Sequence, residues 1–144
     1  MSGSATKFDI GGKMLFADVL YNKHLIGDFS SNGMPDKAHT LVPNLHEFTY
    51  DVYFWVDNAE ISQALEFDIN QSFGDHRYVW GHECRIAGGH QWDTWDNTKM
   101  HWVPSGIPCK PKSKAWNHLI LKGKRNADNH LVFQSVTLNG VTNK

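Results

Sequence analysis

The sequence has little of several features that would assign it to a class directly. Its 144 residues include 14 basic and 15 acidic residues, so the net charge is only −1. A near-neutral chain lacks the basic face that attracts nucleic acid or anionic membranes, and neither is expected as a partner. No apolar run approaches the roughly 18 residues of a membrane span. The composition indicates one folded domain over residues 1–144, long enough to bury a core.

Cysteine is scarce as well, and no secretion-signal pattern is found, so either the protein is intracellular or the signal is absent from this chain. The opening segment, "MSGSATKFDI", does not place an apolar stretch after a charged one. Cys84 and Cys109 have no partner at zinc-site spacing, so structural zinc is not expected. A disulfide from Cys84 to the irregular segment 104–114 would stabilise the fold by roughly 3 kcal/mol and imply an oxidising compartment. Two buried free thiols are the alternative.

A long helical period is absent after residue 46, where apolar residues recur at every second position. Alternation is clear in "FTYDVYFWV" (48–56) and "ALEFDIN" (64–70), and it predicts strands. Further strands are predicted in "HRYVWGHECRI" and "QWDTWD", whereas "PSGIPCKPKSK" is predicted to be an irregular surface loop. "AWNHLILKGKR" and "HLVFQSVTLNG" predict a hairpin around "NADN". Residues 46–144 should therefore form an antiparallel β-sandwich or barrel.

The first 45 residues are less regular and form the N-terminal part of the expected domain. The segment 13–27 is compatible with a short helix or with two strands, and 28–44 has the composition of a loop.

The last hairpin carries a resemblance to a known fold family. "AWNHLIL" followed by "VTLNGV" resembles the paired strands of the concanavalin A-like lectin and glucanase superfamily, including laminin-G-type domains. The resemblance implies a jelly-roll β-sandwich in which Trp116 anchors its strand in the core. Asn139-Gly140 should supply the positive φ angles of a tight turn.

A closer resemblance covers roughly residues 46–142. "FTYDVYFWV", "QALEFDINQ", "QWDTWDN", "HWVPSGIPC" and "AWNHL", in this order, look like a group of bacterial extracellular domains of that superfamily. The resemblance implies a Cys84–Cys109 disulfide and an extracellular location. Because the group continues past the Asn-Gly turn, the resemblance implies a sandwich truncated at its C-terminus, with an open sheet edge that would favour a homo-oligomer.

The strand "ALEFDIN" places Glu66, Asp68 and Asn70 on one face, opposite an apolar face. Laminarinase-type members of the superfamily carry Glu-x-Asp-x-Glu on one strand, where the two Glu residues are nucleophile and acid/base. Glu66 and Asp68 match, but Asn70 cannot deliver a proton. Hydrolysis would therefore need Glu83 or Asp93 from a neighbouring strand.

The same strand also predicts a metal site. Legume-type lectins bind calcium and a transition metal through a similar order of ligands, here Glu66, Asp68, Asn70, Asp75 and His82. Oxygen ligands suit Ca²⁺, so a calcium ion is the first candidate cofactor.

Direct sugar binding is a third interpretation. "GGHQWDTWDN" supplies rings that stack on sugar C–H faces and polar groups that bond hydroxyls. The candidates are His90, Trp92, Asp93, Trp95, Asp96 and Asn97. Alternation leaves only one of Trp92 and Trp95 available. Trp80 and His82 join Glu66 only if the strand register places them on that face.

The remaining alternative is a solvated sheet face fastened by Arg77 or Arg85. We expect a carbohydrate-binding, lectin-like domain that takes a glycan or small-molecule ligand. A metal-assisted hydrolase of the same fold, acting on a glycan or on an ester or lactone, is the alternative. No Gly-x-Ser-x-Gly or His-x-x-x-His motif marks a nucleophile or a metal.

Overall fold

A computed structural model describes residues 3–11, 18–21, 46–73 and 75–144. The chain divides into two units, Met1–Val42 and Pro43–Lys144, a few residues from the predicted limit at 45/46. Residues 3–11 and 18–21 form neither helix nor strand. The expectations for 13–27 and 28–44 fall almost wholly outside the described residues. In the part that the structure describes, no helix is long and apolar enough to cross a membrane.

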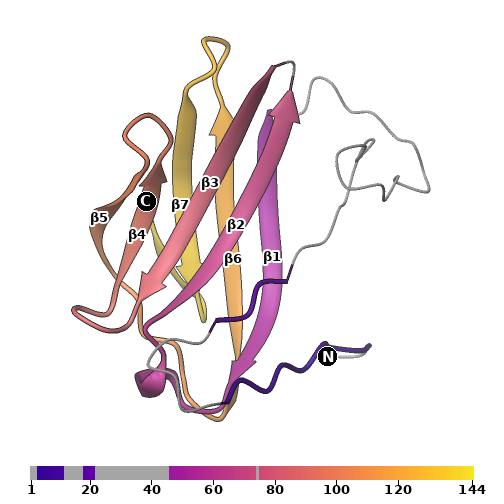
Figure 1. Cartoon of the computed structure of the whole chain (residues 1–144), viewed down its shortest axis with the longest axis vertical. Coiled ribbons are helices and arrows are strands. Elements are labelled where there is room, and N and C mark those ends of the chain that lie inside the picture. Colours follow the sequence, from indigo (N-terminus) through magenta and orange to yellow (C-terminus); the bar gives the residue numbers. More distant parts are fainter. Residues whose placement is uncertain (1–2, 12–17, 22–45, 74) are drawn as a thin grey trace. The chain divides into compact units, whose positions relative to one another are not determined.

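The second unit is an all-β sandwich of two four-stranded antiparallel sheets, as predicted (Figure 1). One sheet has the order β1-β6-β7-β8 and the other β2-β3-β4-β5. The strands are β1 (Glu47–Val56), β2 (Ala64–Phe73), β3 (His76–Arg85), β4 (Gln91–Asp96), β5 (His101–Pro108), β6 (Ala115–Arg125), β7 (Leu131–Leu138) and β8 (Val141–Asn143), with a short 3₁₀ helix, η2 (Ala59–Ile61).

Alternation of side chains decides which residues fill the sandwich. In β1 every second residue, from Phe48 to Val56, is half-buried and the others are exposed, because successive side chains of a strand point to opposite faces. Residues from both sheets meet in one apolar cluster. Its buried members are Ala59, Cys84, Ile86, Trp92, Cys109, Leu119, Leu121 and Val136.

Trp80 crosses this interior from β3 to the opposite sheet. Its indole lies so close to Gly123 of β6 that a Cβ atom on the glycine would stand 2.7 Å from Cδ1 of Trp80. Phe48 packs on the same ring at 4.7 Å between centroids. Gly123 therefore makes room for the largest side chain in the core.

The segment predicted as an irregular loop is partly a strand. Residues His101–Pro108 form β5 at the edge of its sheet, with a register shift opposite Trp92 and Asp93. An edge strand tolerates Pro104 and Pro108 because one side of its backbone needs no ladder partner. The prediction of an irregular loop from residue 104 is therefore wrong for residues 104–108, which continue β5 past a bulge.

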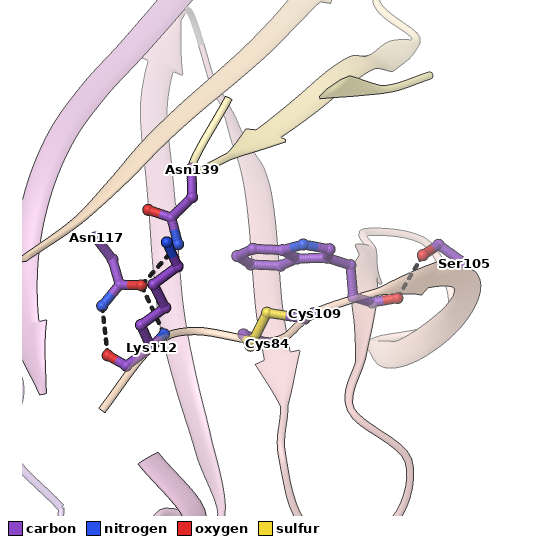
Figure 2. Close-up of a disulfide and its surroundings, with 7 residues drawn as sticks. Cys84, Ser105, Cys109, Lys112, Asn117 and Asn139 are labelled. Carbon is purple, nitrogen blue, oxygen red and sulfur yellow. Dashed lines mark hydrogen bonds between the residues drawn. A yellow bond between two sulfur atoms is a disulfide. The ribbon is translucent and has the colours of Figure 1, made fainter. Parts of the chain in front are cut away.

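The predicted disulfide joins Cys84 of β3 to Cys109, directly after β5 (Figure 2). The two Cα atoms are 5.6 Å apart, and no cysteine is free. Both sulfur-bearing residues are buried in the apolar cluster. The bridge therefore fastens the end of the edge strand β5 to β3, a central strand of the sheet.

The anchor of β6 is Asn117, and the expectation that Trp116 enters the core is wrong. Trp116 is 45% exposed, whereas Asn117 is fully buried. Its Oδ1 accepts from the Lys112 backbone N–H at 2.8 Å and from Asn139 Nδ2 at 2.9 Å, and its Nδ2 donates to the Lys112 carbonyl at 2.9 Å (Figure 2). Because successive side chains of the strand alternate between its two faces, Asn117 points into the core and Trp116 points outward.

The turn at Asn139-Gly140 is as predicted. The φ angles are 51° and 85°, the left-handed values that a two-residue hairpin turn requires. The Asn139 side chain also accepts from the His118 backbone N–H at 3.0 Å. β8 then pairs with β7 only from Val136 to Leu138, so the rest of β7 has one ladder partner, β6.

Candidate functional site

The outward side of the β2-β3-β4-β5 sheet collects four carboxyl groups, and we call it the acidic face. The register places Glu66 of β2 opposite Glu83 of β3, and Glu83 opposite Asp93 of β4. Cross-strand neighbours on one face have Cβ atoms about 4.5–5.5 Å apart. Asp68 follows Glu66 on the same side of β2. Three strands therefore bring four acidic residues into adjoining positions.

A pair of indoles lies beside these carboxyl groups. Trp95 of β4 pairs with Trp102 of β5, and their rings meet edge to face at 5.2 Å between centroids. Asp68 pairs with Gly81 of β3. A Cβ atom on Gly81 would stand 2.7 Å from Cβ of Trp95 and 3.1 Å from Cη2 of Trp102. The missing side chain therefore lets the Trp102 ring lie over β3, next to the position of Asp68.

The carboxyl groups repel one another. The pKa of Asp68 is raised to about 6, first by loss of water around the group and second by the charge of Glu66. The backbone N–H of His82, which donates to Asp68 Oδ1 at 3.3 Å, acts in the opposite direction. The pKa of Glu83 is raised by burial, by Glu66 and by Asp93. Carboxyl groups whose pKa is raised by burial and by like-charged neighbours are candidates for a functional site.

Asp93 is held differently from the other three. It is buried, and its Oδ2 accepts from Arg85 Nε at 2.7 Å. Its Oδ1 is buried without a hydrogen-bond partner among the described residues. Arg85 thus neutralises Asp93 and leaves Glu66 and Asp68 without an arginine partner in the described part of the chain.

Asn70 belongs to the structural alternative. Its Oδ1 accepts from Nε of Arg77 at 3.3 Å and from Nη2 at 2.9 Å. The solvated-face interpretation is therefore correct for Asn70. Glu66 and Asp68 make no hydrogen bond to either arginine among the described residues, because Arg77 bonds the amide and Arg85 bonds Asp93, although the charge of Arg77 still acts to lower the pKa of Asp68.

The structure does not bring the five predicted metal ligands together. His82 pairs with Phe67 and is buried on the inner side of β3, where its ring packs edge to face on Phe133 at 5.0 Å. Burial lowers its pKa to about 4. Asp75 lies in the β2–β3 turn and contacts His76. Among the described residues, no three His, Cys, Asp or Glu side chains are grouped to hold a metal.

The predicted sugar-binding residues divide between the two sides of the sheet. Trp80 and Trp92 are buried core residues, so including them among the ligand contacts was wrong. Trp95 is the available member of its pair, as alternation required, and Asp93 also lies on the acidic face. His90, at φ 51°, directly precedes β4 and contacts Glu60 at 3.3 Å.

Asn97 and Asp96 hold backbone at the end of β4. Asn97 accepts from the Val79 N–H at 3.0 Å and donates to the Val79 carbonyl at 2.8 Å. Asp96 accepts from the N–H groups of Thr98 and Lys99, and these bonds lower its pKa. Both side chains therefore hold backbone groups at the end of β4 and in the turn that follows it, and neither is assigned to a ligand.

Two residues of the acidic face were not predicted, Trp102 and Gly81. Trp102 lies in "MHWVP", which could have been paired with "QWDTWD" across the turn "NTKM". The prediction of a loop from residue 104 obscured that pairing. Gly81 could not be recognised without knowing that Trp102 crosses β4. Comparison with family models, curated proteins and solved structures finds no match to this chain, so the concanavalin A-like resemblance stays a prediction.

Proposed function

We propose that the acidic face binds a neutral glycan. The observation that carries the proposal is the set of like-charged carboxyl groups beside the Trp95–Trp102 pair. Glu66 and Asp68 remain exposed and form no ion pair within 4.0 Å among the described residues, although the charge of Arg77 partly offsets the rise in the pKa of Asp68. A protein gains no stability from crowding unpaired carboxylates, so their arrangement is better explained by a ligand.

The chemistry of the face fits sugar hydroxyls. Carboxylate oxygens only accept hydrogen bonds when ionised, and hydroxyl groups can donate to them. The half-buried rings of Trp95 and Trp102 offer an apolar surface for the C–H side of a sugar ring. An anionic ligand would be repelled, which selects a neutral chain. The disulfide supports location in an oxidising compartment, where extracellular glycans are met.

Affinity electrophoresis in gels that contain laminarin, xylan or galactomannan tests this proposal. At least one of these neutral glycans should retard the protein. Trp102→Ala should weaken that binding about tenfold or more, as truncation of a central aromatic contact does. Trp55→Ala, on the opposite sheet, is the matched control and should bind normally. The proposal fails if no neutral glycan retards the protein or if both variants lose binding equally.

One observation also favours glycoside hydrolysis as a second candidate. Asn70 could not act as the acid, but the register places Glu83 directly opposite Glu66. Retaining enzymes hold their two carboxyl groups about 5 Å apart, close to the usual spacing of cross-strand neighbours. Burial and the charge of Glu66 raise the pKa of Glu83, which is the direction that a general acid requires. Glu83 would then be the acid/base, Glu66 the nucleophile and Asp68 the assisting carboxylate.

Release of reducing ends from the same three glycans separates the two candidates. A hydrolase should release them and lose the activity in Glu83→Gln, whereas the exposed Glu60→Gln should retain it. A binding domain should retard on the glycan gel and release nothing.

A further inference from the structure

The outward side of the other sheet carries a second set of side chains, which the proposed glycan site does not use. On β6 the outward residues are Trp116, His118, Ile120, Lys122 and Lys124, alternating with buried ones. A strand rises about 3.3 Å per residue, so this row extends for about 26 Å. We call the outward side of β1, β6, β7 and β8 the lysine face.

One end of the lysine face is an exposed aromatic cluster. Trp55 and Trp116 meet edge to face at 5.9 Å between centroids, and Tyr53 stacks on His118 at 4.1 Å. Tyr53, Trp55 and Trp116 are 46%, 50% and 45% exposed. His118 Nε2 contacts Asp51 Oδ1 at 2.7 Å, which fixes the ring on which Tyr53 lies. Large rings held half-open to solvent in this way mark an interaction surface.

The other end is a groove of about 740 Å³ over β6, β7 and β8. Its lining combines lysines with hydroxyl and amide groups and contains no acidic residue. The lining residues are Ile120, Lys122, Lys124, Val132, Phe133, Gln134, Ser135, Thr137, Thr142 and Lys144. Hydroxyl groups of Thr137 and Thr142 bond each other at 2.8 Å across β7 and β8.

The lysines of the groove have no ion-pair partner in the described part of the chain. Their ammonium groups lie beyond 4.0 Å from every described carboxylate, although Glu47 of β1 is opposite Lys124 in the register. Unpaired ammonium groups beside hydroxyls attract an anion that also accepts hydrogen bonds. Charge complementarity therefore selects a negatively charged occupant for this groove.

We propose that the lysine face binds an anionic polysaccharide, a chain whose sugar rings carry sulfate or carboxylate groups. Lys122 and Lys124 contact its anionic groups, and the Trp55–Trp116 cluster stacks on its rings at the other end of the row. This inference does not rest on the function proposed for the acidic face. The two sites differ in the charge of their ligand, and each can fail without the other.

Dextran sulfate and uncharged dextran, which share one backbone, test the inference by titration calorimetry of the full chain in 150 mM salt. Dextran sulfate should bind and dextran should not. Lys122→Gln with Lys124→Gln should weaken binding about tenfold or more, and Trp116→Ala should also weaken it. The matched control, Lys110→Gln with Lys112→Gln, removes the same charge from exposed positions outside the groove and should bind within about twofold of the native protein.

Trp102→Ala on the acidic face should leave dextran sulfate binding unchanged. The inference is overturned if dextran sulfate does not bind, if dextran binds as tightly, or if the control pair loses as much affinity as the groove pair. Tighter binding of poly(dT) than of dextran sulfate would also overturn it, because the groove would then favour a nucleic acid.

Discussion

The two outward faces of the sandwich differ in charge: one gathers carboxyl groups, and the other gathers lysines on β6 beside the carboxyl groups of Glu47 and Asp51 on β1. The β2-β3-β4-β5 sheet presents Glu66, Asp68 and Glu83 beside one pair of indoles. The β1-β6-β7-β8 sheet presents Lys122 and Lys124, with its aromatic cluster at the far end. The net charge of −1 conceals this division. The near-neutral total argues against nucleic acid or anionic membranes as partners, but it does not show how charge is divided between the two faces.

The faces also differ in how their side chains are held. On the acidic face the pKa values of Asp68 and Glu83 are raised by burial and by neighbouring carboxylates. On the lysine face the fixed elements are neutral contacts, such as the stack of Tyr53 on His118. Removal of charge should therefore relieve repulsion on the acidic face and leave the stability of the lysine face nearly unchanged.

Removal of the disulfide should have the largest effect. Cys84→Ala with Cys109→Ala frees a loop of sequence separation 25, which should lower the free energy of unfolding by about 3 kcal/mol. Urea denaturation measures this loss. The bridge ties β5 to β3 below the acidic face, so neutral-glycan binding should fall more than dextran sulfate binding. The reduced native protein should match the variant, and equal stability with and without the bridge would contradict the prediction.

Asn117→Ala should have the second-largest effect on stability, because it leaves the Lys112 backbone and the Asn139 side chain without their buried hydrogen-bond partner. Loss of a buried hydrogen-bond partner costs about 1–3 kcal/mol, and we expect about 2 kcal/mol here. Trp116→Ala, one residue away but outward, is the matched control and should change stability by no more than about 0.5 kcal/mol. Thermal unfolding of the two variants separates them. The reverse order would mean that Trp116 anchors β6 after all.

Gly81→Ala should act on the acidic face alone. The added methyl group would stand 2.7 Å from Trp95 Cβ, so Trp95 and Trp102 must shift. Crowding of this kind costs about 1–2 kcal/mol, measured by urea denaturation. Glycan retardation should weaken, while dextran sulfate binding stays at the native value. Gly140→Ala is the control: its added methyl group would meet no atom within 4 Å, but the positive φ at this position disfavours alanine. It should lower stability without weakening glycan retardation. A Gly81→Ala protein that binds glycan normally would show that the position of Trp102 does not matter.

The fold was largely predictable because alternation is a local signal. Strands β1, β2, β3, β4, β6 and β7 were all found from period two, and so was the burial of one tryptophan in the pair Trp92 and Trp95. β5 was missed because its signal is interrupted by Pro104 and by a bulge. The direction of Trp116 was misjudged because the resemblance outweighed the alternation with Asn117.

The site was less predictable because it depends on register. Glu66 and Asp68 were identified, but their neighbours required the pairing of β2 with β3 and of β3 with β4. A slip of one residue would have placed Trp80 and His82 on the acidic face. The packing of Trp80 on Gly123 settles this register in the folded chain, and that contact joins residues 43 positions apart. No local pattern contains such information.

The smallest expected effect is that of Asp68→Asn, and its sign depends on pH. The folded protein holds the Asp68 proton with a pKa of about 6, against 3.8 for an unperturbed aspartate. Between these pH values Asp68 is therefore protonated more often in the folded state than in the unfolded chain. The stability that this protonation contributes is lost as pH rises from about 4 to about 6. Asn removes the ionisation, so the variant should melt at the native temperature near pH 4 and slightly above it at pH 7.5. Asp57→Asn, at an exposed carboxyl outside this face, is the control and should show no such pH-dependent gain. Calorimetric melting at the two pH values measures the difference. A variant that is less stable than the native protein at pH 7.5 would mean that ionised Asp68 supports the fold, and the acidic face would then differ little from an ordinary solvated sheet.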